Sequence, residues 1–153
     1  MLKFTFIIGF LICCTTIFSQ EKDTSFTLCG EGEIYPYYYP ELSYKGGFWA
    51  VKQHYEKDYP TSQFQKLKKN SGIVTVQFRI NCKGETGRFI IKLCDLNYQR
   101  VIIDKKILNY FLIKTKTLTN WIPAEDGKGK TTNSHKFFSF RIKGGVLLEI
   151  LPK

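Results

Sequence analysis

The side chains that most often do chemistry are few and scattered in this chain. Its histidines, His54 and His135, lie in distant segments, and His54 sits two residues before Glu56. A zinc site needs three or four Cys, His or carboxylate ligands at close spacing. Glu125 and Asp126 are adjacent in a lysine-rich loop, which is typical of a solvated turn. The sequence therefore predicts no metal, no cofactor and no catalytic residue, so a protein that is not an enzyme.

Residues 1–19 have the composition of a cleaved export signal. Lys3 precedes an apolar run, Phe4–Cys14, and small polar residues follow it up to Ser19. The apolar run is shorter than the ~20 residues that cross a bilayer as a helix. We therefore expect export to the periplasm or beyond, with no transmembrane span once the leader is removed.

An exported chain meets an oxidising compartment in which disulfides form. Beyond the leader the cysteines are Cys29, Cys82 and Cys94, enough for one disulfide and one thiol. With a turn over Lys83–Thr86, Cys82 lies opposite Gly87, and Cys94 lies some ~23 Å further along the hairpin. A disulfide needs a Cα separation under ~7 Å. We therefore predict a Cys29–Cys82 disulfide and a free Cys94.

Apolar residues at intervals of three and four predict helices over Phe48–Lys57, Thr61–Lys69 and from Asp104 to Trp121. Thr61 and Asp104 are the candidate N-caps. The predicted apolar positions are Phe48, Val51, Tyr55, Phe64, Leu67, Ile107, Leu108, Phe111, Leu112 and Leu118.

Alternating apolar and polar residues predict strands over Val74–Ile80 and Phe89–Leu93, joined by a short turn, and over Phe138–Ile142. Gly144-Gly145 is a strong hairpin signal, so Val146–Leu151 should return as a last strand with Val146, Leu148 and Ile150 facing the core. We predict an α+β fold: an antiparallel sheet of three to four strands with two or three helices packed on one face.

The predicted domain covers residues 46–153, and residues 20–45 form an irregular arm. The arm contains the tyrosines Tyr35, Tyr37, Tyr38 and Tyr39. Their rings could stack on a ligand, although packing across the domain's own apolar surface is the interpretation we favour. The chain has a net charge of +10, but its Lys and Arg residues are scattered and no nucleic-acid motif accompanies them. We therefore expect a basic face exposed to anionic envelope material.

Five features in order resemble the C-terminal domain of the TonB family. They are the glycine pair Gly46-Gly47, the strand Gly72–Phe78, the turn glycine Gly84, the segment Trp121–Ala124 and the apolar strand Phe138–Ile142. The resemblance implies a non-enzymatic module of the Gram-negative cell envelope, linked to TonB-dependent transport. Such domains bind an extended peptide of a partner protein as an added strand.

In that family the peptide joins the sheet next to the strand that Phe138–Ile142 resembles. The resemblance therefore makes Phe138, Phe140 and Ile142 candidate partner contacts, together with Tyr35, Tyr37, Tyr38 and Tyr39. The chain departs from the family in two ways. The stretch between the leader and Gly46 is shorter than the long spacer by which the family's transducer crosses the periplasm, since it reaches under ~100 Å. In addition, Val146–Leu151 would itself occupy the sheet edge to which the family binds its peptide.

Two other hypotheses stay open. A basic envelope domain could bind an anionic polymer such as lipopolysaccharide, peptidoglycan or nucleic acid, and that binding would weaken as salt rises whereas strand addition would change little. An enzyme would need His54 or His135 to meet Cys94 or a carboxylate in a pocket. Pairing through a sheet edge would also allow two copies of the chain to form a homodimer.

Overall fold

The computed structural model describes residues 26–30, 33–36, 38 and 42–152. The predicted leader, Tyr37 and Tyr39 lie outside these residues. The helices are α1 (Gly47–Glu56), α2 (Thr61–Phe64) and α3 (Lys105–Lys116). The strands are β1 (Ile34–Tyr35), β2 (Ser43–Tyr44), β3 (Gly72–Ile80), β4 (Thr86–Cys94), β5 (Trp121–Ile122), β6 (Asn133–Lys143) and β7 (Val146–Leu151).

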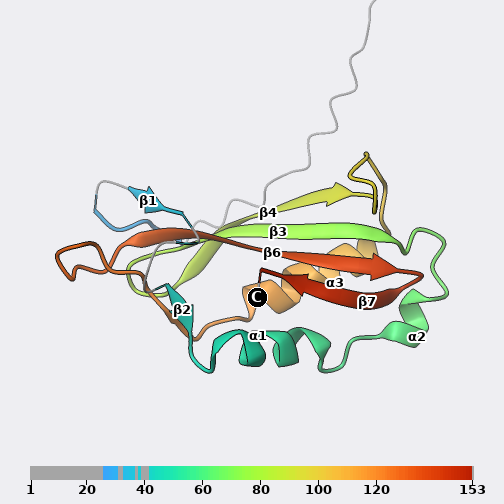
Figure 1. The fold of residues 1–153 in the computed structure, drawn as a ribbon, viewed down its shortest axis with the longest axis horizontal. Helices are drawn as coiled ribbons and strands as arrows, with labels where there is room; N and C mark the ends of the chain where they lie inside the picture. Colours follow the sequence, from blue (N-terminus) through green and yellow to red (C-terminus); the bar gives the residue numbers. More distant parts are fainter. Residues whose placement is uncertain (1–25, 31–32, 37, 39–41, 153) are drawn as a thin grey trace, which may run out of the picture.

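The predicted α+β class is confirmed. The four long strands are antiparallel in the order β4-β3-β6-β7, and β1 adds a short parallel pairing to β6, which makes a five-stranded sheet. The three helices lie together on one side of this sheet (Figure 1). The described part of the predicted arm contains β1 and β2, and β2 pairs with β5 in a separate two-stranded ribbon. Strands of two residues are too short for periodicity to indicate them.

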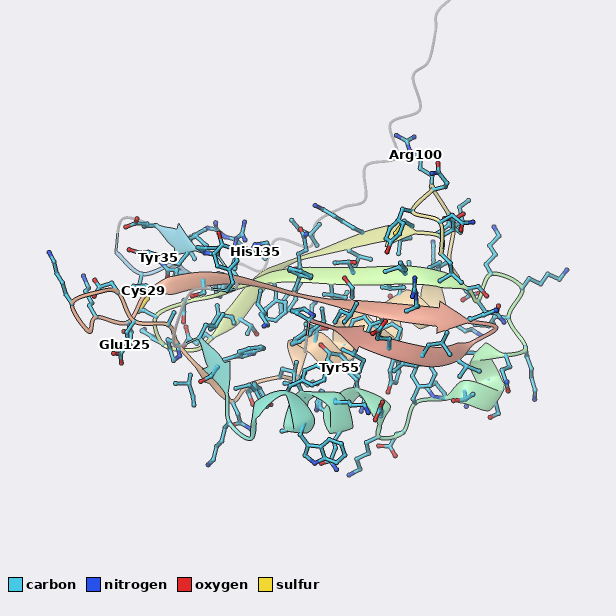
Figure 2. All side chains as sticks on the ribbon, viewed as in Figure 1. Cys29, Tyr35, Tyr55, Arg100, Glu125 and His135 are labelled. Atoms are coloured by element: carbon cyan, nitrogen blue, oxygen red, sulfur yellow. A yellow bond between two sulfur atoms is a disulfide. The ribbon has the colours of Figure 1, made fainter. Side chains whose placement is uncertain are left out.

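The core lies between the sheet and the helices. Side chains of β3 alternate between buried and half-buried along its whole length, as its sequence predicts. Tyr55 of α1 is fully buried against the sheet (Figure 2), and its hydroxyl shares a 2.9 Å hydrogen bond with Thr115 of α3. The rings of Phe111 and Phe140 stack at 4.0 Å. These contacts hold α1 and α3 to one face.

The helix ends follow the prediction in part. The carboxylate of Asp104 accepts a 2.9 Å hydrogen bond from the backbone N–H of Lys106, so this N-cap is confirmed. The Thr61 cap is wrong, because Pro60 takes the cap position and makes no side-chain hydrogen bond to the helix. Helix α2 is a single turn, whose last carbonyls accept hydrogen bonds from the side-chain amide of Asn70.

The helix ending at Trp121 was also predicted too long. Helix α3 ends at Lys116, and Trp121 instead begins β5, where its ring meets Tyr44 of β2 edge-on at 5.1 Å. The pairing of two segments far apart in the sequence decides this boundary, which the local pattern cannot show.

The second hairpin forms as predicted. Gly144 and Gly145 both have positive φ, 56° and 76°, which a two-residue turn of this kind requires. A β-bulge between Arg141 and Ile142 shifts the register, so that Leu147 packs on the core. Leu148, which alternation placed in the core, is 55% exposed.

Candidate functional site

One edge of the sheet is closed by the protein's own strands. Strand β6 pairs with β3 on one side, and on the other side with β7 along Ser139–Lys143 and with β1 at Asn133 and Ser134. This is the edge that the TonB-like resemblance assigns to a peptide. Phe138, Phe140 and Ile142 are at most 2% exposed, so the structure places these predicted partner contacts in the core and not on a binding surface.

The opposite edge is open. Strand β4 is nine residues long and pairs only with β3 among the described strands. Within the described ranges no other segment forms a backbone hydrogen bond with residues of β4. The edge therefore presents a row of backbone donors and acceptors to which an extended chain can pair.

An apolar strip runs beneath this edge. Phe89, Ile91 and Leu93 face the core side of β4 but stay half-buried, because they lie at the margin of the helical layer. Val101 packs on the core beside them, and Ile102 is 69% exposed. A hollow of about 450 Å³ lies here, and it is lined by Leu93, Arg100, Val101 and Ile102.

The loop after β4 brings these residues under the edge. The carboxylate of Asp95 accepts hydrogen bonds of 2.8 Å from the backbone N–H groups of Asn97 and Gln99. A further backbone bond from Asp95 to Gln99 closes the loop, and the chain then turns back toward α3. Arg100 lies at the tip of this loop and projects from the body of the protein (Figure 2). Asp95 is thus the residue whose side chain folds the loop.

The edge is basic and begins with an irregularity. Arg88 has a φ of 54°, and the register shifts there, because Gln77 pairs with Ile90 while Arg79 pairs with Gly87. Such a bulge twists the start of an edge strand. Arg88, Lys92 and Arg100 form no ion pair within the described ranges. An acidic partner would therefore find unneutralised cations along β4.

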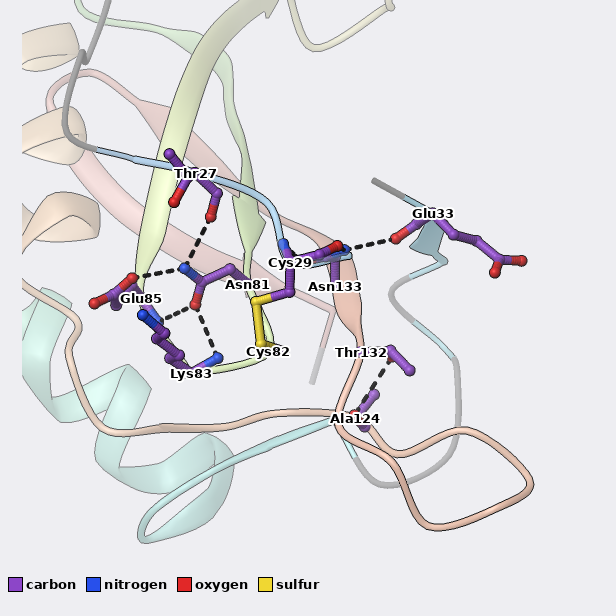
Figure 3. The surroundings of a disulfide bond; sticks show 10 residues. All are labelled: Thr27, Cys29, Glu33, Asn81, Cys82, Lys83, Glu85, Ala124, Thr132 and Asn133. Atoms are coloured by element: carbon purple, nitrogen blue, oxygen red, sulfur yellow. Dashed lines mark hydrogen bonds between the residues drawn. A yellow bond between two sulfur atoms is a disulfide. The ribbon is translucent and has the colours of Figure 1, made fainter. Parts of the chain in front are cut away.

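The predicted Cys29–Cys82 disulfide is present (Figure 3), and Cys94 is a free thiol. The Cα atoms of Cys29 and Cys82 are 5.9 Å apart. The predicted register was wrong by a few residues, since Gly87 lies opposite Arg79. The turn is tighter than predicted because the side chain of Asn81 bonds the backbone N–H groups of Lys83 and Glu85.

Two buried asparagines fasten the arm beside this disulfide. The Asn81 amide donates to the carbonyl of Thr27 at 3.0 Å, and the Asn133 amide donates to the carbonyls of Cys29 and Glu33 at 3.0 and 2.9 Å (Figure 3). Sequence analysis did not single out either asparagine. Asn81 follows the last residue of β3 and Asn133 is the first residue of β6, and at such strand ends a buried asparagine has no distinguishing pattern.

The tyrosines of the arm are only partly described. Tyr35 is half-buried in β1, and Tyr38 is 73% exposed. Tyr37 and Tyr39 lie outside the described residues. The structure thus brings Tyr35 to the end of β6 rather than to the open edge.

The histidines do not converge on a catalytic group. The Nε2 atom of His54 lies 2.8 Å from the carbonyl of Lys114. His135 lies opposite Arg79, and Cys94 lies opposite Ile73, six residues along β3, some ~20 Å away. No group of three His, Cys, Asp or Glu side chains suited to a metal occurs in the described part of the chain.

A second hollow lies on the helical side. It has a volume of about 620 Å³ and is built mainly on α1. Trp49 is 64% exposed there, with the ammonium group of Lys52 5.8 Å from the centre of its ring. The strand that borders this hollow is the two-residue β2, through Tyr44, which offers too few backbone groups for an extended chain, so this hollow is a weaker candidate.

Comparison with known proteins does not assign this chain to a family. No family model, no characterised protein and no solved structure matches this chain. Among the described residues no helix is long and apolar enough to cross a membrane. The disulfide is compatible with a secreted or periplasmic protein.

Proposed function

We propose that this protein is a non-enzymatic binding module of the cell envelope that takes up an extended segment of a partner protein as a new strand on β4. The open nine-residue edge above an apolar strip supports this proposal most strongly. An added strand gains main-chain hydrogen bonds along the edge, and its alternate side chains provide specificity.

The partner's chemistry follows from the side chains along the edge. Alternate residues of an added strand point to the two faces of the sheet. Those on the helical side would contact Leu93, Val101 and Ile102, so they should be apolar. The remaining contacts are with Lys92 and Arg88, so acidic residues are favoured at the other positions. We therefore propose an extended segment that alternates apolar and acidic residues.

A second copy of this chain fits the edge less well. Antiparallel pairing of β4 with β4 brings the Arg88 and Lys92 side chains of two copies close together. Like charges that face each other across a strand pair are destabilising. The bulge at Arg88 also hinders continuous pairing. The acidic segment of a different protein is thus the proposed occupant, and a homodimer through this edge is not.

This proposal keeps the binding mode of the TonB-like resemblance and moves it to the other edge. Strand β7 occupies the position that the resemblance gives to the peptide. Among the described strands, β4 and β7 each pair on one side only, and β4 is the longer of the two, so we place the added strand next to β4. A link to TonB-dependent transport would require that the partner recognise β4.

A direct test titrates the protein with a short acetylated peptide of alternating valine and glutamate. We expect a micromolar dissociation constant and amide chemical-shift changes confined to β4 and to Val101 and Ile102. Ile102→Ala should weaken binding about tenfold, since it removes most of one apolar side-chain contact. Leu148→Ala is the matched control, because Leu148 is also an exposed aliphatic residue but lies on β7.

A second peptide, N-methylated at alternate residues, separates strand addition from simple charge attraction. N-methylation removes backbone donors but leaves every side chain in place, so the peptide methylated on the paired side should not bind. Shift changes along β6 and β7 would contradict the proposal, as would equal affinity for the peptide in all its methylated forms.

A further inference from the structure

The face of the sheet opposite the helices contains an array of cations. Residues of β3 that point away from the core pair directly with basic residues of both neighbours. Arg79 lies opposite His135 of β6, Thr75 lies opposite Lys92 of β4, and Ile73 lies opposite Arg141 of β6. From Arg79 to Ile73 the array extends ~20 Å along the strands. No described helix covers this face (Figure 1).

These cations are not neutralised by the protein. Arg79, Lys92, His135 and Arg141 form no ion pair within the described ranges. Glu149, which lies opposite Arg141, is the one carboxylate that the register brings into the array. Burial, followed by the charge of Arg88, lowers the pKa of Arg79, and burial, Arg79 and Lys92 lower that of His135. The folded protein therefore holds like charges close together, which is a cost that an anionic partner would relieve.

Aliphatic side chains accompany the cations. Ile90, opposite Gln77, is 38% exposed, and Leu151, opposite Ser139, is 41% exposed. Both point to the same face as Arg79. A surface that combines Lys and Arg with exposed aliphatic residues suits the interface of a membrane, where the cations meet headgroups and the aliphatic groups meet the acyl boundary.

We propose that this face docks on a membrane containing anionic phospholipids, with Arg79, Lys92 and Arg141 against headgroup phosphates. The arrangement favours a lipid surface over a polymer because the cations spread across three strands as well as along them. Such a two-dimensional array matches a surface. Single-stranded nucleic acid is instead bound in a charged groove by stacking on successive aromatic rings. The two proposals share Lys92, but this site rests on the cations of β3 and β6 on the sheet face, whereas strand addition rests on the unpaired edge of β4.

The test is co-sedimentation of residues 20–153, the chain without the predicted apolar leader, with vesicles of phosphatidylglycerol and phosphatidylcholine in equal parts. We expect binding that falls steeply as salt rises and is absent with phosphatidylcholine alone. The triple variant Arg79→Gln, Lys92→Gln, Arg141→Gln should bind about a hundredfold more weakly, because each cation near an anionic surface contributes about fivefold.

The matched control removes the same charge from the helical side. Lys45→Gln, Lys57→Gln, Lys105→Gln should weaken binding by less than about tenfold, since these exposed residues would lie near or beyond a Debye length of ~10 Å from the membrane. A charge-preserving variant changes the same three positions: Arg79→Lys, Lys92→Arg, Arg141→Lys. Its affinity for the vesicles should stay within a few-fold of that of the unaltered protein. This result would show that the loss in the first variant comes from the missing charges and not from unfolding.

Three outcomes would overturn the proposal. Equal losses in the first two variants would mean that net charge alone attracts the protein. Binding to phosphatidylcholine vesicles would mean that the cations are not required. Binding to a single-stranded oligothymidylate, lost in the triple variant, with no binding to the anionic vesicles, would assign the face to nucleic acid.

Discussion

The outer sides of β6 and β4 differ in what lies next to them. The outer edge of β6 is covered by β7 over one half and by β1 at the other end, whereas the outer edge of β4 has no strand beside it. The covered side belongs to β6, which has five buried residues, as many as β3. The open edge belongs to a strand with half-buried apolar residues, a bulge and lysine and arginine side chains.

This difference indicates where a strand of a partner protein can pair with the sheet. A sheet edge with unpaired backbone groups attracts other chains, and proteins limit this with charges and bulges. The outer side of β6 is paired at residues 133–134 and 139–143, which leaves only the short stretch 135–138 without a neighbouring strand among the described residues. Strand β4 has charged side chains and a bulge but no strand on its outer side. Under our proposal, these features disfavour a second copy and favour an acidic segment, so they also provide selectivity.

The largest expected effect comes from uncovering the closed edge. Removing the residues after Gly144 deletes β7 and with it the buried Ile150 and the packed Leu147. At roughly 1.5–3 kcal/mol for each buried side chain, the loss approaches the whole stability of a small domain. We expect an unfolded or aggregated chain by circular dichroism and size-exclusion chromatography.

Ile150→Ala is a smaller change of the same kind, because it removes one buried side chain of β7 but keeps the β6–β7 pairing. The free energy of unfolding should fall by about 2–4 kcal/mol in urea denaturation. A truncated chain that remained folded with undiminished stability would show that β7 is dispensable, and the contrast between the two edges would lose its structural basis.

The disulfide has the next largest effect, because it ties the arm to the turn that joins β3 and β4. Cys29→Ser with Cys82→Ser should lower the free energy of unfolding by about 2–4 kcal/mol, since the unfolded chain is no longer cross-linked. Cys94→Ser is the control and should change it by less than about 0.5 kcal/mol. Equal stability of the two variants in urea denaturation would mean that the cross-link contributes little.

Much of the fold could be predicted, because it depends on local patterns. The spacing of Val51 and Tyr55 predicted α1, Asp104 predicted the start of α3, and Gly144-Gly145 predicted the return of β7. The Cys29–Cys82 pair followed from excluding Cys94 by distance along a hairpin. Each of these inferences uses residues that are close in sequence, or a geometry fixed by them.

The candidate site could not be predicted, because it depends on which strands become neighbours. Nothing in the sequence of β4 shows that β6 inserts on the far side of β3 and leaves β4 at the edge. The bulge at Arg88, the turn organised by Asn81 and the position of Ile102 beneath β4 are likewise tertiary. The resemblance to the TonB family directed attention to Phe138, Phe140 and Ile142, whose alternation marks burial and not recognition.

Gly87 gives a way to sharpen the comparison at the start of the open edge. A Cβ atom placed at Gly87 would overlap the side chain of Phe26, so the ring would have to move. Gly87→Ala should therefore cost about 1–3 kcal/mol by overpacking. The cost should shrink when Phe26→Ala is combined with it, and a double-mutant cycle in urea denaturation measures this coupling. Additive effects would mean that Phe26 does not pack on Gly87.

The smallest expected effect concerns His135 and the charges on the open face. Burial, Arg79 and Lys92 hold the pKa of His135 below its usual 6.5, so the unfolded chain binds this proton more readily than the folded one. Neutral His135 therefore makes its full contribution to the free energy of unfolding above pH 6.5. That free energy falls as the pH drops below this value. His135→Gln should remove this part of the pH dependence. NMR titration of the imidazole should show a pKa that rises in Lys92→Gln, and a pKa unchanged by that substitution would mean that Lys92 is too distant to belong to the cationic array.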